Sequence, residues 1–344
     1  LPITDSRRRM ILRFLKNPVH KNFVPFLDNL FLLRPTLFFP VWVMVTAGMT
    51  ASIMNISRYQ VWLSDFDFFT LALFIGITLI SGSTFIINQI QDMESDALNQ
   101  KLFLVGKKVH IELAQKIQKM TLILGFIFLL ISGYMALIMG ALLFLFWGYL
   151  YNIKPFHWKK KPLLGMFANS MAGLILYSAG WIHVASSEGL SFMNFGWLEM
   201  FLISIPYLLC YTAVSLLTTI PDMDGDEPTG AITFPVKFGL RTTIALAGTM
   251  VLAAFWLGWS YDDPVSTTSA IMSFPFYVVA LIRNQNKDVL RAIRYSIFIL
   301  AFLLFTVYPL LLPAVLVVFY LSKYYYWHRF NLHYPTFLVD EVEE

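Results

Sequence analysis

The sequence predicts an all-α, polytopic membrane protein with about nine transmembrane helices in a bundle around a central cavity. Hydrophobic residues make up 58% of the 344 residues and charged residues only 13%, a composition typical of membrane-embedded chains. The apolar residues form long runs, several of which reach the roughly 20 residues that a helix needs to cross a bilayer. No linker or low-complexity tract divides the chain, so we expect a single domain over 1–344.

The apolar runs define the expected helices in chain order. They lie near 37–54, 68–90, 120–137, 139–151, 163–184, 198–220, 241–260, 265–282 and 296–321. The third and fourth runs are nearly continuous, and we place a tight turn near Gly140. Aromatic residues account for 17% of the chain, more than interfacial belts require, which favours a cavity lined with rings.

The charges at the ends of the runs indicate the orientation. A basic arm, 1–36, precedes the first run, and we expect no separate signal peptide; an acidic tail, 335–344, ends the sequence. With alternating loops, all of the 25 Lys and Arg residues except Arg58, Lys323 and Arg329 fall on one side. The positive-inside rule makes that side cytoplasmic, and both acidic clusters described below lie on it. Nine spans then place the acidic tail outside.

Two acidic clusters stand where apolar runs end. In the first, Asn88, Asp92 and Asp96 recur every four residues, which puts them on one face of a continuous helix. Asp222 and Asp226 repeat the spacing in the second, and the same offset separates the two pairs of aspartates. A carboxylate in the bilayer centre costs about 2.5–3.5 kcal/mol, so we expect these side chains to face a wet cavity and carry cations.

The ligand types in these clusters predict the kind of cation. Oxygen donors without His or Cys suit a hard ion, and Mg²⁺ usually binds one or two carboxylates together with substrate phosphates. In a bilayer, the matching substrate is a polyprenyl diphosphate. Charge withdrawal from its leaving group promotes ionisation of the allylic C–O bond, and aromatic faces in a dry pocket stabilise the resulting cation.

Three stretches resemble the UbiA superfamily of intramembrane prenyltransferases. NQIQDMESD is similar to its first motif, IPDMDGD to its second, and YLYNIKP with the following lysines to its loop between the fourth and fifth helices. The resemblance implies catalytic and Mg²⁺-binding roles for Asn88, Asp92, Asp96, Asp222 and Asp226. It also implies substrate-binding roles for Tyr149, Tyr151, Lys154 and Lys159.

The sequence also departs from the family pattern at two places. Thr218 and Thr219 stand where many members have Lys-Asp, which removes one phosphate-binding charge and one carboxylate. An Arg-Pro stretch after the first motif is replaced by NQKLFLVGKK, and we expect Lys101 and Lys107 to contact the diphosphate instead. The first motif resembles the carotenoid branch and the second the homogentisate branch, so the acceptor is either a polyene or an aromatic ring.

The expected activity is prenyl transfer from an isoprenoid diphosphate to a lipophilic acceptor at the cytoplasmic face. The expected partners are the polyprenyl diphosphate, the acceptor and the lipid bilayer, with no nucleic acid. Two alternatives stay open: an ion-coupled transporter, and a catalytically weakened member that binds pigment or quinone in a complex. Taken singly, each acidic cluster also fits a solvated helix end, and Lys159, Lys160 and Lys161 fit a headgroup anchor.

Overall fold

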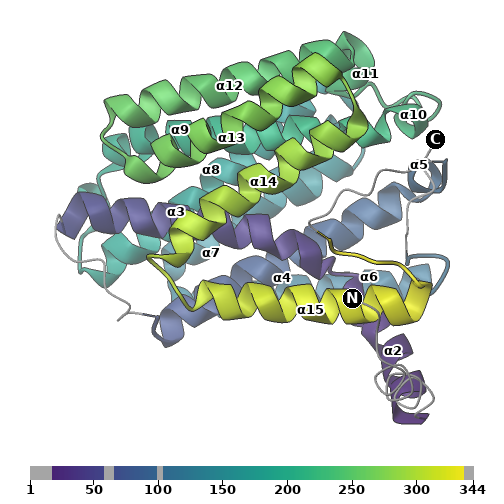
Figure 1. Cartoon of the computed structure of the whole chain (residues 1–344). Helices are drawn as coiled ribbons and strands as arrows, with labels where there is room; N and C mark the ends of the chain where they lie inside the picture. Colours follow the sequence, from purple (N-terminus) through teal and green to yellow (C-terminus); the bar gives the residue numbers. More distant parts are fainter. Residues whose placement is uncertain (1–17, 58–65, 99–103, 337–344) are drawn as a thin grey trace, which may run out of the picture.

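The structure, a computed structural model, describes residues 18–57, 66–98 and 104–336. Over these residues every regular element is helical, apart from one isolated β-bridge between Val105 and Val109. Most of the long helices run roughly along one axis, α2 projects away from them, and the short helices α5, α10 and α11 gather at one end of the bundle (Figure 1). The expected all-α architecture is confirmed.

The elements follow the apolar runs closely. The longer helices are α2 (Pro18–Phe31), α3 (Phe38–Ser57), α4 (Phe68–Gln91), α6 (Ile111–Ser132), α7 (Tyr134–Leu143), α8 (Pro162–Ser187), α9 (Trp197–Leu217), α12 (Leu240–Ser260), α13 (Pro264–Arg283), α14 (Asn286–Phe305) and α15 (Leu311–Phe330). The short helices are η1 (Pro35–Leu37), α5 (Met93–Leu98), the π-helical η3 (Phe144–Leu150), η4 (Trp158–Lys160), η5 (Phe192–Asn194), η6 (Ile220–Asp222), α10 (Met223–Asp226) and α11 (Phe234–Phe238).

Seven helices of the described ranges are long and apolar enough to cross a membrane, so the expected count of about nine is not confirmed. The run at 139–151 is too short to qualify, because α7 and η3 together cover only Tyr134–Leu150. The expected span at 296–321 is wrong, because the chain breaks between α14 and α15 at Pro309. Proline lacks the amide hydrogen that a continuing helix requires.

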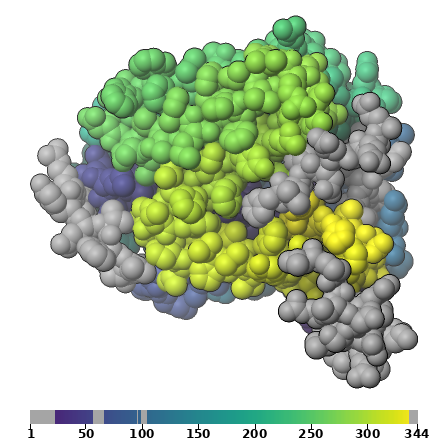
Figure 2. Space-filling view, in the orientation of Figure 1, coloured from purple at the N-terminus to yellow at the C-terminus, as the bar shows by residue number. Residues whose placement is uncertain are grey.

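This break reverses the chain once more. α15 packs against the two N-terminal elements α2 and η1. In the view of Figure 2 it forms the lower part of the surface, beneath α13 and α14. Near its end, Arg329 Nη2 lies 2.7 Å from Asp28 Oδ2 of α2, and the Tyr325 hydroxyl donates to Asp28 Oδ1 at 2.6 Å. Farther on, the carbonyl of Thr336 accepts a hydrogen bond from Arg294 Nη1 at 2.9 Å.

The expected position of Arg329 on the side opposite the acidic clusters is therefore corrected. Arg329 and the last described residues lie at the end of the bundle that holds the acidic clusters, not at the opposite end. The acidic tail beyond 336 falls outside the described residues. The shift adds one more cation to the basic side of the molecule, since Arg329 was counted on the other side.

The bundle core depends on close contact between α3 and α8. A Cβ atom added at Gly48 would lie 1.9 Å from the carbonyl oxygen of Tyr177, and one added at Gly180 would lie 2.0 Å from that of Val45. Small residues let membrane helices approach backbone to backbone in this way. Fully buried Trp181 and Tyr207 fill the adjacent space. This contact sets the position of α8, which contributes to the candidate site.

Candidate active site

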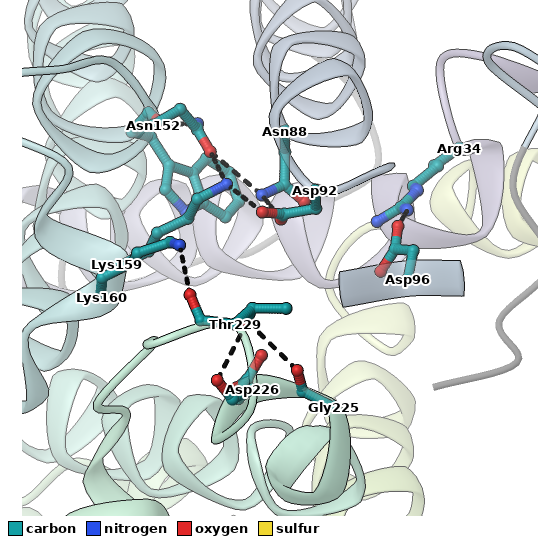
Figure 3. Close-up of polar contacts among 11 residues, drawn as sticks. Arg34, Asn88, Asp92, Asp96, Asn152, Lys159, Lys160, Gly225, Asp226 and Thr229 are labelled. Carbon is teal, nitrogen blue, oxygen red and sulfur yellow. Dashed lines mark hydrogen bonds and ion pairs between the residues drawn. The ribbon is translucent and has the colours of Figure 1, made fainter. Parts of the chain in front are cut away.

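The first acidic cluster lies at a helix break. α4 ends at Gln91, Asp92 follows with φ −102° and ψ 11°, and α5 starts at Met93. The expectation of one continuous helix through Asn88, Asp92 and Asp96 is therefore wrong. Asn88 Nδ2 donates to Asp92 Oδ2 at 2.6 Å, an i,i+4 side-chain bond that holds these two residues together on the last turn of α4. The break turns Asp96 away from Asp92 and towards Arg34 (Figure 3).

The second acidic cluster follows the end of α9. The hydroxyls of Thr218 and Thr219 donate to the carbonyls of Ser215 and Leu216, both at 2.7 Å, as the last helical turn closes. The chain then forms the short turns η6 and α10, which carry Asp222 and Asp226. Both aspartates thus lie on short helical turns just after a long helix ends, as Asp96 of α5 does after α4.

The two clusters share one cavity of about 180 Å³. Its lining residues are Arg34, Asn88, Gln91, Asp92, Glu94, Asp96, Tyr151, Lys159, Lys160, Thr219, Asp222, Asp226, Thr229 and Ala231. All five residues with an expected metal-binding role line this cavity, together with Tyr151 and Lys159. The tertiary structure thus brings together groups from both halves of the sequence.

Lys159 connects the central loop to the first cluster. Its Nζ lies 2.5 Å from Asp92 Oδ1 and 3.2 Å from the amide oxygen of Asn152. Asn88 Nδ2 donates to the same Asn152 oxygen at 3.0 Å, and Asn152 Nδ2 donates to the carbonyl of Trp147 at 2.8 Å. Burial lowers the pKa of the Lys159 ammonium, while the neighbouring Asp92 carboxylate opposes that shift.

Two further cations face the cavity from other directions. Arg34 Nη2 lies 3.5 Å from Asp96 Oδ2. Lys160 Nζ donates to the carbonyl of Thr229 at 3.1 Å, and the Thr229 hydroxyl donates to the carbonyl of Asp226 at 3.0 Å (Figure 3). The cavity is therefore lined by carboxylates of both clusters, with Lys159 and Lys160 on one side and Arg34 on the other (Figure 3).

Three described residues with expected substrate-binding roles, Lys107, Lys154 and Tyr149, do not line this cavity. The fourth such residue, Lys101, lies outside the described residues. Lys107 is exposed in the turn before α6, and Lys154 is exposed beside Pro155. Tyr149 is 39% exposed, and its ring packs against Phe156 with centroids 5.7 Å apart. Lys107, Lys154 and Tyr149 therefore stand outside the cavity lining, and their substrate-binding roles stay predictions.

Other residues that line the cavity or contact its lining have no role in the sequence-based prediction. Asn152 belongs to the YLYNIKP stretch, so its motif was a usable signal, and Lys160 was assigned only to a headgroup anchor. Arg34 stands directly before the first span, a position that topology alone explains. Thr229 has no local signal, because only the tertiary fold places it on the cavity wall and in contact with Lys160.

The donor set fits Mg²⁺. Carboxylate, amide and hydroxyl oxygens line the cavity, and these hard donors are the ones Mg²⁺ prefers. Within the part of the chain that the structure describes, no three His, Cys, Asp or Glu side chains converge as a complete metal site. Mg²⁺ keeps several waters and completes its shell with substrate phosphate, so partial protein coordination suits it. The three cations would face the phosphate oxygens.

The fold and the site define a class of protein first: a multi-pass membrane protein with a carboxylate-lined cavity at one end of a helical bundle. Residues 41–294 match the UbiA prenyltransferase family, and the chain belongs to that family. This result confirms the resemblance seen in the three sequence motifs.

Several relatives are prenyltransferases from Humulus lupulus. The chain is 32% identical over 188 residues to its chloroplastic 2-acylphloroglucinol 4-prenyltransferase, covering 52% of this chain and 44% of that protein. It is 27% identical over 218 residues to the 2-acyl-4-prenylphloroglucinol 6-prenyltransferase, covering 61% and 52%. The chain thus spans about half the length of these relatives.

Solved structures share the fold. A UbiA homolog from Archaeoglobus fulgidus bound to GPP and Mg²⁺ is 15% identical, covers 81% of this chain and 99% of its own, and superposes with a TM-score of 0.59. A UbiA homolog from Aeropyrum pernix K1 is 18% identical, covers 82% and 96%, and gives a TM-score of 0.58. At these identities the similarity concerns the fold alone.

Proposed function

We propose that the protein transfers a prenyl group from an isoprenoid diphosphate to an aromatic acceptor, with Mg²⁺ as cofactor. The observation that carries the proposal is the single cavity in which both carboxylate clusters meet Arg34, Lys159 and Lys160. A diphosphate with its magnesium ions has the complementary charges. The Humulus lupulus relatives, which are named for phloroglucinol acceptors, favour an aromatic ring over a polyene.

Each part of the cavity has a distinct task in this proposal. Asn88, Asp92, Asp96, Asp222 and Asp226 would hold the metal, which when bound withdraws charge from the leaving diphosphate. Lys159, Lys160 and Arg34 would bind the phosphate oxygens by charge-assisted hydrogen bonds. These bonds grow stronger as negative charge collects on the leaving group, so they lower the barrier to C–O cleavage.

Aromatic rings lie directly behind the cavity. Phe85 is one helical turn before Asn88, and its ring packs edge-on against Trp147 with centroids 5.3 Å apart. Trp147 Nε1 donates to Asn169 of α8 at 2.9 Å, which fixes the orientation of the indole. Ring faces here would stabilise the allylic cation, and the apolar helices would exclude the water that quenches it. The acceptor ring forms the new C–C bond and then loses a proton.

We also propose that the cavity opens to the cytoplasm. The basic residues of the connecting segments gather at the cavity end of the bundle, as the positive-inside rule requires of a cytoplasmic side. Arg34, Lys159 and Lys160 belong to this group, and Arg329 joins it through its contact with Asp28. A cytoplasmic opening gives a water-soluble or membrane-borne diphosphate direct access to the site.

The test is prenyl transfer in proteoliposomes with an isoprenoid diphosphate, a phenolic acceptor and Mg²⁺. We expect prenylated acceptor and pyrophosphate in equal amounts, and neither product when Mg²⁺ is chelated. Asp226→Asn should lower turnover by about 100-fold or more, because it removes a charge that holds the metal. Asp224→Asn is the matched control, since Asp224 is exposed and does not line the cavity.

The same assay separates the alternatives. A weakened member would bind the diphosphate without releasing pyrophosphate. An ion-coupled transporter would move cations across the vesicle membrane without consuming any diphosphate. If Asp226→Asn kept near wild-type transfer at saturating Mg²⁺, the two-cluster mechanism would be wrong.

A further inference from the structure

The ammonium group of Lys159 occupies a ligand position of the first acidic cluster. Its Nζ contacts two oxygen atoms, Asp92 Oδ1 at 2.5 Å and Asn152 Oδ1 at 3.2 Å. The other carboxylate oxygen, Asp92 Oδ2, accepts from Asn88 Nδ2 at 2.6 Å. The Lys159 side chain is only 8% exposed, so this ammonium is held inside the cavity rather than in bulk water.

A metal ion and this ammonium compete for the same carboxylate. Mg²⁺ binds oxygen at about 2.0–2.1 Å and demands near-ideal geometry around itself. An ammonium that stays within hydrogen-bond distance of that oxygen would lie only about 4 Å from a doubly charged ion, where the repulsion is large. Asp92 can therefore form a close ion pair with Lys159 or coordinate Mg²⁺, but it cannot do both at once.

The Lys159 side chain can adopt a second orientation, in which its ammonium leaves Asp92. It sits in the short helix η4, which borders the cavity, and its four-carbon stem can redirect the ammonium without moving the backbone. Its neighbour Lys160 is tied to the opposite wall through the Thr229 carbonyl at 3.1 Å. A diphosphate in the cavity would lie between these two walls and within reach of both lysines.

We propose that Lys159 is an internal counter-ion of Asp92 that yields this carboxylate to Mg²⁺ and then binds the diphosphate. The proposal rests on the function proposed above, because it needs a diphosphate in the cavity. The consequence is that Mg²⁺ binding and diphosphate binding are coupled. Mg²⁺ alone binds weakly, because it must displace the Lys159 ammonium from Asp92. Mg²⁺ binds more tightly when diphosphate is present, because the displaced ammonium then contacts a phosphate oxygen. The coupling disfavours an incompletely loaded site.

The first test measures Mg²⁺ affinity by titration calorimetry on the full chain in nanodiscs, with and without pyrophosphate. Lys159→Met should bind Mg²⁺ alone about 10-fold more tightly than wild type, because the competing cation is gone. The same variant should bind pyrophosphate at saturating Mg²⁺ about 10-fold more weakly. Lys161→Met is the matched control, since Lys161 is exposed in the same loop, and both affinities should stay unchanged.

These opposite signs distinguish the proposal from simpler roles. A lysine that only binds diphosphate would give the loss without the gain, and a lysine that only supports the loop would weaken both. Either result would overturn the counter-ion role. It would leave the proposed function standing if turnover by wild type is observed. Absence of turnover with any donor would instead overturn the proposed function, while the gain in Mg²⁺ affinity could still be measured.

A second test needs no variant and so avoids any effect on folding. Wild-type protein is treated with a small amine-acylating reagent, and the modification of each lysine is followed by mass spectrometry. Lys159 should react slowly without ligands, faster with Mg²⁺ alone, and slowly again with Mg²⁺ and pyrophosphate. Lys161 should react at one rate throughout. No acceleration of Lys159 by Mg²⁺ alone would overturn the proposal.

Discussion

Replacement of Gly180 by alanine should destabilise the bundle strongly. A Cβ atom at this position would lie 2.0 Å from the carbonyl oxygen of Val45 and 2.9 Å from the amide nitrogen of Met49. Ordinary contact needs about 3.4 Å, so α3 and α8 would have to separate by more than 1 Å, and overpacking of this kind costs about 1–3 kcal/mol or more. The obstacle is backbone, which cannot rotate away as a side chain would.

The expected net cost is about 2 kcal/mol, because alanine recovers roughly 0.5–1 kcal/mol of helix propensity over glycine. The measurement is the thermal unfolding midpoint in detergent, followed by tryptophan fluorescence. Gly248→Ala is the matched control: it is also a helical glycine, but its nearest neighbour is Tyr277 Cβ at 3.5 Å. This control should be neutral or slightly stabilising.

The same substitution should also reduce turnover in the protein that remains folded. α8 carries Asn169, which orients Trp147, and the Trp147 carbonyl in turn holds Asn152 beside Lys159. A shift of α8 therefore reaches the cavity. If Gly180→Ala unfolded at the same temperature as wild type, the assigned backbone contact between α3 and α8 would be wrong.

Three more predictions follow from the placement of exposed and buried groups. A cysteine at Ser187 should react with an impermeant reagent from outside intact cells, whereas one at Glu227 should react only after permeabilisation; the reverse pattern would contradict the orientation. Lys107→Gln should leave pyrophosphate affinity at saturating Mg²⁺ unchanged, while Lys160→Gln should weaken it about 10-fold; equal effects would show that the loop before α6 reaches the cavity. Asp28→Asn should lower the free energy of unfolding by about 2 kcal/mol, because it removes the buried carboxylate that joins α2 to α15; an unchanged midpoint would argue against that link.

Local patterns in the sequence were sufficient for much of the fold. Hydropathy gave the course of most long helices, since a helix in lipid must satisfy its own backbone and carry apolar side chains along its length. Hydropathy failed where a continuous run of apolar residues contains a helix break. The break near Pro309, between α14 and α15, is the clearest case. Hydropathy averages over composition, whereas a break depends on one residue.

The acidic motifs were also visible in the sequence, and their ligand chemistry followed from residue type. Their geometry was not. Spacing of four residues predicted one helical face for Asn88, Asp92 and Asp96, but the side-chain bond from Asn88 to Asp92 accompanies a break that sends Asp96 to Arg34. A spacing rule assumes regular helical backbone, and the backbone of Asp92, with φ −102° and ψ 11°, departs from it.

The sequence by itself determined that this chain forms apolar helices. It also determined that two of the apolar runs end in carboxylate clusters, whose oxygen atoms are ligands that hard cations prefer. Only the tertiary structure decided that both clusters open into one cavity, that Lys159 rather than Lys107 enters it, and that α15 returns to the acidic end. The reason is physical. Covalent spacing sets what a single helix can present, but the choice of neighbours depends on packing between distant residues, such as the approach of Gly48 and Gly180 to opposing backbone.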